Sequence, residues 1–214
     1  RMAMKEQGIS ALLLNIGENV RYATGSWDQD WKQTNNTRYA LVFHDQPPML
    51  FETVGIDMHV TMLNVPWLEG RILPALTYKY AAKGFEPVCR RYWEQITSIC
   101  KENGVDIKRD LIGFDSLEIP AYEIAKEMGI KCVSSAYAIG KARYVKSKDE
   151  LEMLKIAVAI GDIGYWKLKH EIVKPGMRER EVRGKLIDLM CQLGCGFSLG
   201  HIVASGGNTN PYKR

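Results

Sequence analysis

A run of apolar residues long enough to cross a bilayer is missing from this 214-residue sequence. A membrane-spanning helix needs about 20 consecutive apolar residues, and no segment approaches that length. The first residues also lack the basic stretch followed by an apolar stretch that is typical of a signal peptide. We therefore predict a cytoplasmic protein with no membrane partner.

A strong charge of either sign is missing as well. The 29 basic side chains exceed the 25 acidic ones by only +4, and the lysines and arginines are scattered along the chain. Proteins that bind the phosphates of nucleic acids usually gather basic residues in a patch or stripe. The sequence therefore predicts no nucleic-acid partner.

Paired cysteines and the common metal-binding motifs are also absent. The five cysteines are odd in number and form no Cys-x-x-Cys pair, which favours reduced thiols. Cys191 and Cys195 stand four residues apart on a predicted helix, but two ligands without a second pair make a poor zinc site. No His-x-x-x-His or Glu-x-x-His motif occurs. Local spacing therefore assigns no catalytic residue and no metal ligand.

An alternation of short apolar runs and amphipathic segments is what the first two thirds of the sequence does contain. Such an alternation is typical of an α/β layer structure. The expected strands are residues 11–15, 20–24, 39–43, 49–53, 111–115 and 131–134, and the expected helices are residues 88–103 and 121–128. A turn over residues 44–48 makes the third and fourth strands hairpin-like.

Two long amphipathic helices follow and differ in kind from this alternation. Ser147 and Glu150 have the spacing of a capping box, which predicts a helix that runs to Ile172. A second helix is expected over residues 178–193 and a strand over residues 201–205. We therefore predict two domains, residues 1–142 and residues 143–214.

The most unusual local cluster is the sequence WDQDW at residues 27–31. Loops at the ends of regular elements often carry binding residues, and an indole can offer its face to an apolar or cationic group. One interpretation is therefore that Trp27, Asp28 and Trp31 form the wall of a binding pocket. The alternatives are an exposed loop anchored by one buried indole, or a two-carboxylate metal site with too few oxygen ligands.

Several segments, taken in order, resemble the creatinase / Xaa-Pro aminopeptidase family of prolidase-like enzymes. They are NVRYATG at residues 19–25, ARYVKSKDE at 142–150, VKPGM at 173–177 with Glu179, and IVASG at 202–206. The resemblance implies a creatinase-type N-terminal α/β domain followed by the first helices and strand of the pita-bread (α+β) catalytic fold. It also implies a homodimer in which the N-terminal domain of one subunit reaches the active site of the other.

In that family two Asp, one His and two Glu hold two divalent metal ions, such as Mn, Zn, Fe or Co, that activate water. None of these five ligands has a counterpart in this sequence. The first residue is not Met, and residues 208–214 are a turn-rich tail after an expected strand. We therefore expect a fragment that binds no metal and is inactive as given, from a full-length enzyme that acts on a short peptide or another small molecule.

The segment TNPY at residues 209–212 adds an alternative chemistry. Family peptidases commonly have a His after this Pro, whereas this chain has Tyr212, as in the dimethylsulfoniopropionate (DMSP) lyase branch of the same fold. The resemblance makes Asn210 and Tyr212 candidate substrate-binding residues beside Trp27, Asp28 and Trp31. Three hypotheses stay open: a Xaa-Pro peptidase, a non-peptidase enzyme such as a DMSP lyase or a creatinase-like enzyme, and a non-catalytic dimerisation module.

Overall fold

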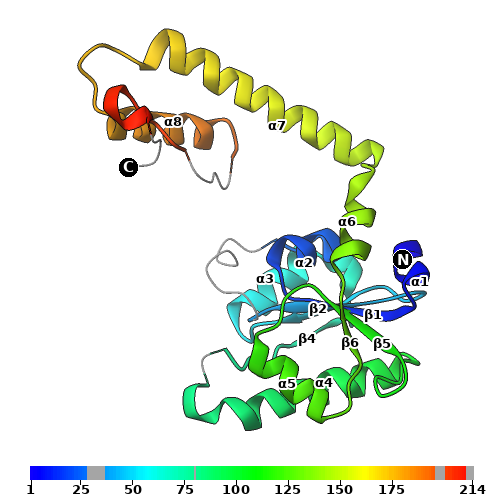
Figure 1. Cartoon of the computed structure of the whole chain (residues 1–214). Helices are drawn as coiled ribbons and strands as arrows, with labels where there is room; N and C mark the ends of the chain where they lie inside the picture. Colours follow the sequence, from blue (N-terminus) through cyan, green and yellow to red (C-terminus); the bar gives the residue numbers. More distant parts are fainter. Residues whose placement is uncertain (28–36, 80, 196–200, 211–214) are drawn as a thin grey trace. The chain divides into compact units, whose positions relative to one another are not determined.

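The computed structural model describes residues 1–27, 37–79, 81–195 and 201–210 (Figure 1). The chain divides into two compact units, Arg1–Val145 and Lys146–Arg214, and each is described by itself below. The boundary expected from the sequence, between residues 142 and 143, lies slightly earlier. Among the described residues no helix combines the length and the apolar character that crossing a membrane requires.

A six-stranded mixed sheet forms the centre of the first unit, in the order β4-β3-β2-β1-β5-β6. Strand β2 is antiparallel to both of its neighbours, and the remaining adjacent pairs are parallel. The strands are β1 (Ile9–Leu14), β2 (Tyr39–Phe43), β3 (Met49–Glu52), β4 (Ile72–Pro74), β5 (Leu111–Phe114) and β6 (Cys132–Ser134). The predicted α/β layer and the β2–β3 hairpin are confirmed.

Helices cover both faces of this sheet (Figure 1). One face carries α4 (Phe85–Glu102) and α5 (Ile119–Glu127), and the other carries α1 (Met2–Glu6), α2 (Gly17–Thr24), α3 (Ile56–Asn64) and α6 (Ala136–Tyr144). Short 3₁₀ turns occur at Pro66–Leu68 and Ala82–Gly84.

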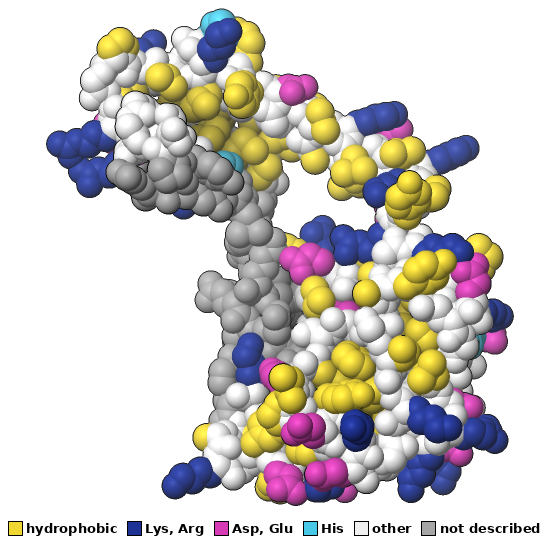
Figure 2. All heavy atoms as spheres, viewed as in Figure 1, with side chains coloured by type: hydrophobic (Ala, Val, Ile, Leu, Met, Phe, Trp, Pro, Cys, Tyr) yellow, Lys and Arg dark blue, Asp and Glu magenta, His cyan; other side chains and the backbone are white. Residues whose placement is uncertain are grey.

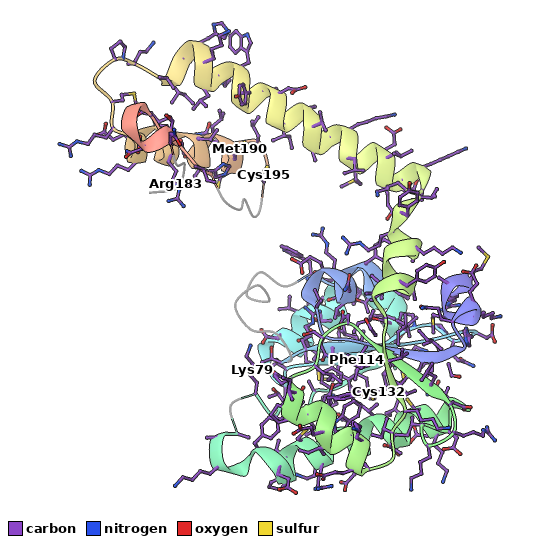
Figure 3. The ribbon with its side chains drawn as sticks, viewed as in Figure 1. Lys79, Phe114, Cys132, Arg183, Met190 and Cys195 are labelled. Carbon is purple, nitrogen blue, oxygen red and sulfur yellow. The ribbon has the colours of Figure 1, made fainter. Side chains whose placement is uncertain are left out.

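The face under α4 and α5 holds the larger aromatic core. Tyr92 and Trp93 of α4 are fully buried, and the Trp93 indole N–H donates to the Ala121 carbonyl at 3.0 Å, which joins α4 to α5. Phe114 of β5 and Cys132 of β6, labelled in Figure 3, pack against the same core. The opposite face buries smaller aliphatic side chains.

The prediction of a strand at residues 20–24 is wrong, because this segment belongs to helix α2. The backbone N–H of Ile16, the residue before α2, donates to the carboxylate of Asp115, which lies 99 residues later in the chain. Gly25 closes the helix with φ 71°, a left-handed conformation that glycine adopts without strain. A cap supplied from so far away leaves no local pattern, so the apolar segment looked like a strand.

The elements α3, β4 and α6 were not predicted from the sequence. β4 is only three residues long and ends at Pro74, and among the described residues it pairs with β3 alone. No element was predicted where α6 lies, and Ala138 on its inner face is 2 % exposed. Contacts with the rest of the unit therefore hold these short elements, whose own periodicity is weak.

The second unit begins with the long helix α7 (Lys148–Lys167), continued by a π-helical turn at Leu168–Ile172. The predicted capping box is confirmed: Ser147 Oγ accepts from the Glu150 N–H at 3.2 Å, and the Glu150 carboxylate accepts from the Ser147 N–H at 2.7 Å. Helix α8 (Glu179–Gln192) and a 3₁₀ turn at Gly206–Thr209 follow.

Helices α7 and α8 approach each other closely where α7 carries a glycine. A Cβ added at Gly164 would lie 3.1 Å from the sulfur of Met190, which belongs to α8 and is labelled in Figure 3. The strand expected at residues 201–205 is not formed, since within the described part of the chain this segment pairs with no other strand. Its backbone is extended at Ser205, but a strand also needs a neighbour for its hydrogen bonds.

Candidate functional site

A half-buried carboxylate lies where the parallel strands β1 and β5 end. Asp115 directly follows β5 and accepts hydrogen bonds from the backbone N–H groups of Asn15 at 2.7 Å and Ile16 at 3.1 Å. Its other partner is the side-chain amide of Asn19, at 2.9 Å. Burial raises the pKa of Asp115, and the hydrogen bonds from Asn15, Asn19 and Ile16 oppose that rise. Because these donors belong to residues at or near the start of α2, we interpret Asp115 as a structural cap of that helix rather than as a free acid or base.

Replacing Asp115 with alanine should therefore destabilise the first unit by about 1–2 kcal/mol, because the N–H groups of Asn15 and Ile16 lose their acceptor. Urea denaturation at pH 7 measures this. Asp45→Ala is the matched control, since the Asp45 side chain is 85 % exposed. An equal loss of stability in both variants would contradict the capping role.

Asn19 continues this network to the end of α6. Its side-chain oxygen accepts from the guanidinium of Arg143 at 2.9 Å. One turn further along α2, the Tyr22 hydroxyl donates to the Ala142 carbonyl at 3.0 Å, and the Arg143 guanidinium lies 5.8 Å from the centre of the Tyr22 ring. Two residues of α2 thus hold the last turn of α6, where the first unit ends.

Trp27, the first of the predicted binding residues, follows α2 and is half-buried. The guanidinium carbon of Arg21 lies 4.3 Å from the centre of the Trp27 ring, which is within cation–π range. One face of this indole therefore already contacts a cation. Asp28 and Trp31 lie outside the described residues, so their role as pocket wall stays a prediction.

A buried ion pair contacts the residues that flank the predicted Trp27 loop, whose residues 28–36 lie outside the described part of the chain. Nε of Arg38 is 2.5 Å from Oε2 of Glu52, and both side chains are at most 2 % exposed. Arg38 also donates to the hydroxyl of Ser26, which directly precedes Trp27. Thr61 of α3 donates to the Glu52 carboxylate at 2.8 Å. The residues that flank this loop are therefore tied to each other and to β3 and α3.

In the second unit, a carboxylate at the start of α8 holds the turn that precedes Asn210. Glu179 accepts from the Ser205 N–H at 2.6 Å, from the Ser205 hydroxyl at 2.8 Å and from the Asn208 side chain at 3.2 Å. Hydrogen bonding from Ser205 and Asn208 lowers the pKa of Glu179. The turn that Glu179 holds leads directly to Asn210, which is exposed. Tyr212 lies outside the described residues.

Glu179→Ala should speed hydrogen exchange of the Ser205 amide by about tenfold or more, because a charge-assisted acceptor is lost. Glu179→Gln keeps one acceptor oxygen and should lie between the two. Since the folded-state pKa is lowered, the protection is present above the unfolded pKa and is lost as the pH falls through the folded pKa.

The control for this prediction is Glu171→Ala, which removes another exposed carboxylate of the second unit. We expect it to leave Ser205 exchange unchanged. Unaltered exchange in Glu179→Ala would show that the carboxylate does not hold the turn.

A metal centre does not fit the residues that the structure describes. Nowhere in residues 1–27, 37–79, 81–195 and 201–210 do three or more His, Cys, Asp or Glu side chains gather closely enough to hold an ion. Asp115, Glu52 and Glu179 are each occupied by protein donors.

Sequence reasoning missed Asp115, Asn19, Arg38 and Glu52 as parts of these networks. Asn15 and Asp115 are each the last residue of a predicted strand, so the rule that parallel strands end at a common edge could have brought them together. Nothing local marks Arg38 and Glu52, because the sheet pairs residues from adjacent strands. Glu179 was noted only as part of a family-like segment.

Comparison with known proteins gives one family and one fold. The creatinase/prolidase N-terminal domain family matches residues 1–145. A search of curated proteins finds no match. Solved structures with a similar fold include the prolidase from Pyrococcus furiosus (22 % identity, TM-score 0.60) and an Xaa-Pro dipeptidase from Bacillus anthracis (20 %, TM-score 0.63).

The alignments extend beyond the matched family domain into the second unit. They cover 89 % and 91 % of this chain, but only 51 % and 47 % of the Pyrococcus and Bacillus chains. An X-Pro aminopeptidase from Thermotoga maritima gives similar values, 90 % and 48 %, at 15 % identity and a TM-score of 0.59. The chain thus spans about half the length of the proteins whose fold it shares.

Proposed function

Since the chain belongs to the creatinase/prolidase N-terminal domain family, we propose that it is the substrate-side part of an enzyme that hydrolyses short Xaa-Pro peptides in the cytoplasm. The observation that carries the proposal is the family match over residues 1–145, together with a fold likeness to dipeptidases that continues into the second unit. Trp27, Asp28, Trp31, Asn210 and Tyr212 are its proposed substrate-contacting residues.

The two divalent metal ions implied by the family resemblance would supply an activated water. The described residues do not offer a ligand set for them, so the proposal assigns no metal-dependent step to this chain. The roles proposed for its own residues are to bind and to orient. Arg38 and Glu52 hold the base of the Trp27 loop, and Glu179 holds the turn before Asn210. A homodimer would let these segments serve a neighbouring active site.

One observation favours a second candidate, a family member that acts on a small cationic molecule. The Arg21 guanidinium over the Trp27 ring shows that this indole suits a cation. A sulfonium or quaternary ammonium group is also a cation and binds the face of an aromatic ring in the same way. DMSP and creatine are therefore the non-peptide substrates to compare with Xaa-Pro dipeptides.

The test uses two proteins, this 214-residue chain and the product of the complete reading frame, each incubated with Mn²⁺. We expect proline release from Xaa-Pro dipeptides by the complete product, and neither release nor stoichiometric metal with the 214-residue chain. Dimethyl sulfide from DMSP, or urea from creatine, without proline release would favour the second candidate. If the complete product turns over none of these substrates, the non-catalytic dimerisation module is the remaining hypothesis.

A further inference from the structure

An apolar pocket, called the cavity below, lies on the face of the sheet that α1, α2 and α6 cover and is partly open to solvent, since Tyr22 in its wall is 46 % exposed. Figure 1 shows these three helices. The volume of the cavity is about 240 Å³. The aliphatic part of its wall comes from four elements and the turn before β3, and consists of Met4, Leu12, Leu14, Val42, Pro48 and Ile139. Three alanines, one on α2 and two on α6, complete the wall where larger side chains would have filled the space: Ala23, Ala138 and Ala142.

The few polar groups at the cavity already have partners in the protein. The Asn19 amide donates to Asp115 and its oxygen accepts from Arg143. The Tyr22 hydroxyl donates to the Ala142 carbonyl, and the Arg1 guanidinium donates to the Gln46 carbonyl at 2.6 Å. A buried water typically needs two to four polar partners. Water is therefore held weakly in this cavity.

The volume of the cavity indicates the size of molecule that fits it. Apolar cavities of about 150 Å³ stay dry and take up benzene. A single leucine at one of the alanine positions would remove much of the space, yet small residues line it on two facing helices.

We propose that this cavity is a binding site for a compact, uncharged apolar molecule of about the size of a substituted benzene ring. Contacts with the aliphatic walls and release of weakly held water drive the binding. The site is separate from the Trp27 loop and from the Asn210 segment, so the proposal does not depend on the proposed enzymatic activity.

The site touches the link between α2 and α6 described above. Asn19, Tyr22 and Ala142 line the cavity and also make the contacts that hold the last turn of α6. A bound molecule would pack under these contacts. Its arrival is therefore expected to change the NMR signals of Tyr22 and Ala142, which report on the occupied cavity.

The test is titration of the complete 214-residue chain with toluene, followed by thermal unfolding and by NMR. We expect a saturable rise in Tm and saturable shifts confined to the cavity walls. Ala138→Leu fills the cavity from α6, where Ala138 is 2 % exposed, and should weaken toluene binding by about tenfold or more. Ala136→Leu adds the same side chain to an exposed position of the same helix and should leave binding unchanged.

Ala23→Leu is the second filling variant, from the opposite helix, in case Ala138→Leu fails to fold. The absence of saturable toluene binding to the unmodified chain would overturn the proposal. So would equal binding by the unmodified chain and by a folded filling variant.

Discussion

Replacing Arg38 with methionine is expected to lower the free energy of unfolding of the first unit by about 3–5 kcal/mol. The Glu52 carboxylate, 1 % exposed, would be left without the cation 2.5 Å away. The hydroxyl of Ser26 would lose its partner in the same step. Breaking a buried pair on one side costs much more than the pair contributes as a whole, because the remaining charge stays in a medium that solvates it poorly.

Urea denaturation of Arg38→Met and Glu52→Leu, singly and together, measures this effect. The double variant should lose less stability than the sum of the single ones, since it leaves no buried charge. Lys155→Met is the matched control: its partner Glu152 is 2.7 Å away, but both side chains are about 70 % exposed. Additive losses, or an equal loss in the control, would contradict the role assigned to the buried pair.

Enzyme kinetics distinguish two possible roles of this ion pair, which are to position Trp27 and to stabilise the fold. In the complete reading-frame product, a folded Glu52→Gln variant should raise KM more than it lowers kcat, because the base of the Trp27 loop would shift while the chemistry is unaffected. An unchanged KM would mean that the pair stabilises the fold without positioning Trp27.

The 214-residue chain is expected to associate in solution through α7. Figure 2 shows hydrophobic side chains along this helix. Leu154 is 48 % exposed, Val158 61 % and Trp166 57 %, and Asp162 is the only charged residue between positions 156 and 166. A helix that is apolar on all sides is normally buried, and large exposed apolar patches drive association. Size-exclusion chromatography with light scattering should therefore show species larger than a monomer, or precipitation.

Leu154→Glu/Val158→Glu places two charges on one face of α7 and should shift the chain toward the monomer. The matched control is Val54→Glu/Leu63→Glu, because these residues are equally exposed apolar side chains in the first unit, each 68 % exposed. A monomeric unmodified chain would refute the prediction outright. An effect of the control pair as large as that of the α7 pair would place the association surface elsewhere.

The elements with a strong local pattern could be predicted from the sequence. The capping box at Ser147 and Glu150 defined the start of α7 because both of its partners lie within one turn. The apolar spacing of Tyr92, Ile96 and Cys100 predicted α4, and all three are buried. The short apolar runs predicted five of the six strands of the sheet, whereas the runs at residues 20–24 and 201–205 form no strand and the three-residue β4 was not predicted.

The networks around the candidate site depended on the tertiary structure. Asp115 caps α2 from the end of β5, the neighbour of β1, and Arg38 meets Glu52 because the sheet places β2 beside β3. No spacing rule within one segment contains such pairs. The cavity is likewise a property of six segments that meet, since its alanines lie on α2 and α6, more than 100 residues apart.

The sequence by itself therefore determined the α/β class, the long helices of the second unit and the resemblance to the creatinase/prolidase family. Each of these rests on residues close together in the chain, where periodicity, capping and short motifs act. Only the tertiary structure decided that residues 20–24 are helical, that residues 201–205 stay unpaired within the described chain, and that an apolar cavity lies beneath α2 and α6. Those outcomes depend on which distant groups supply hydrogen bonds and fill space, and the chain acquires these partners only when it folds.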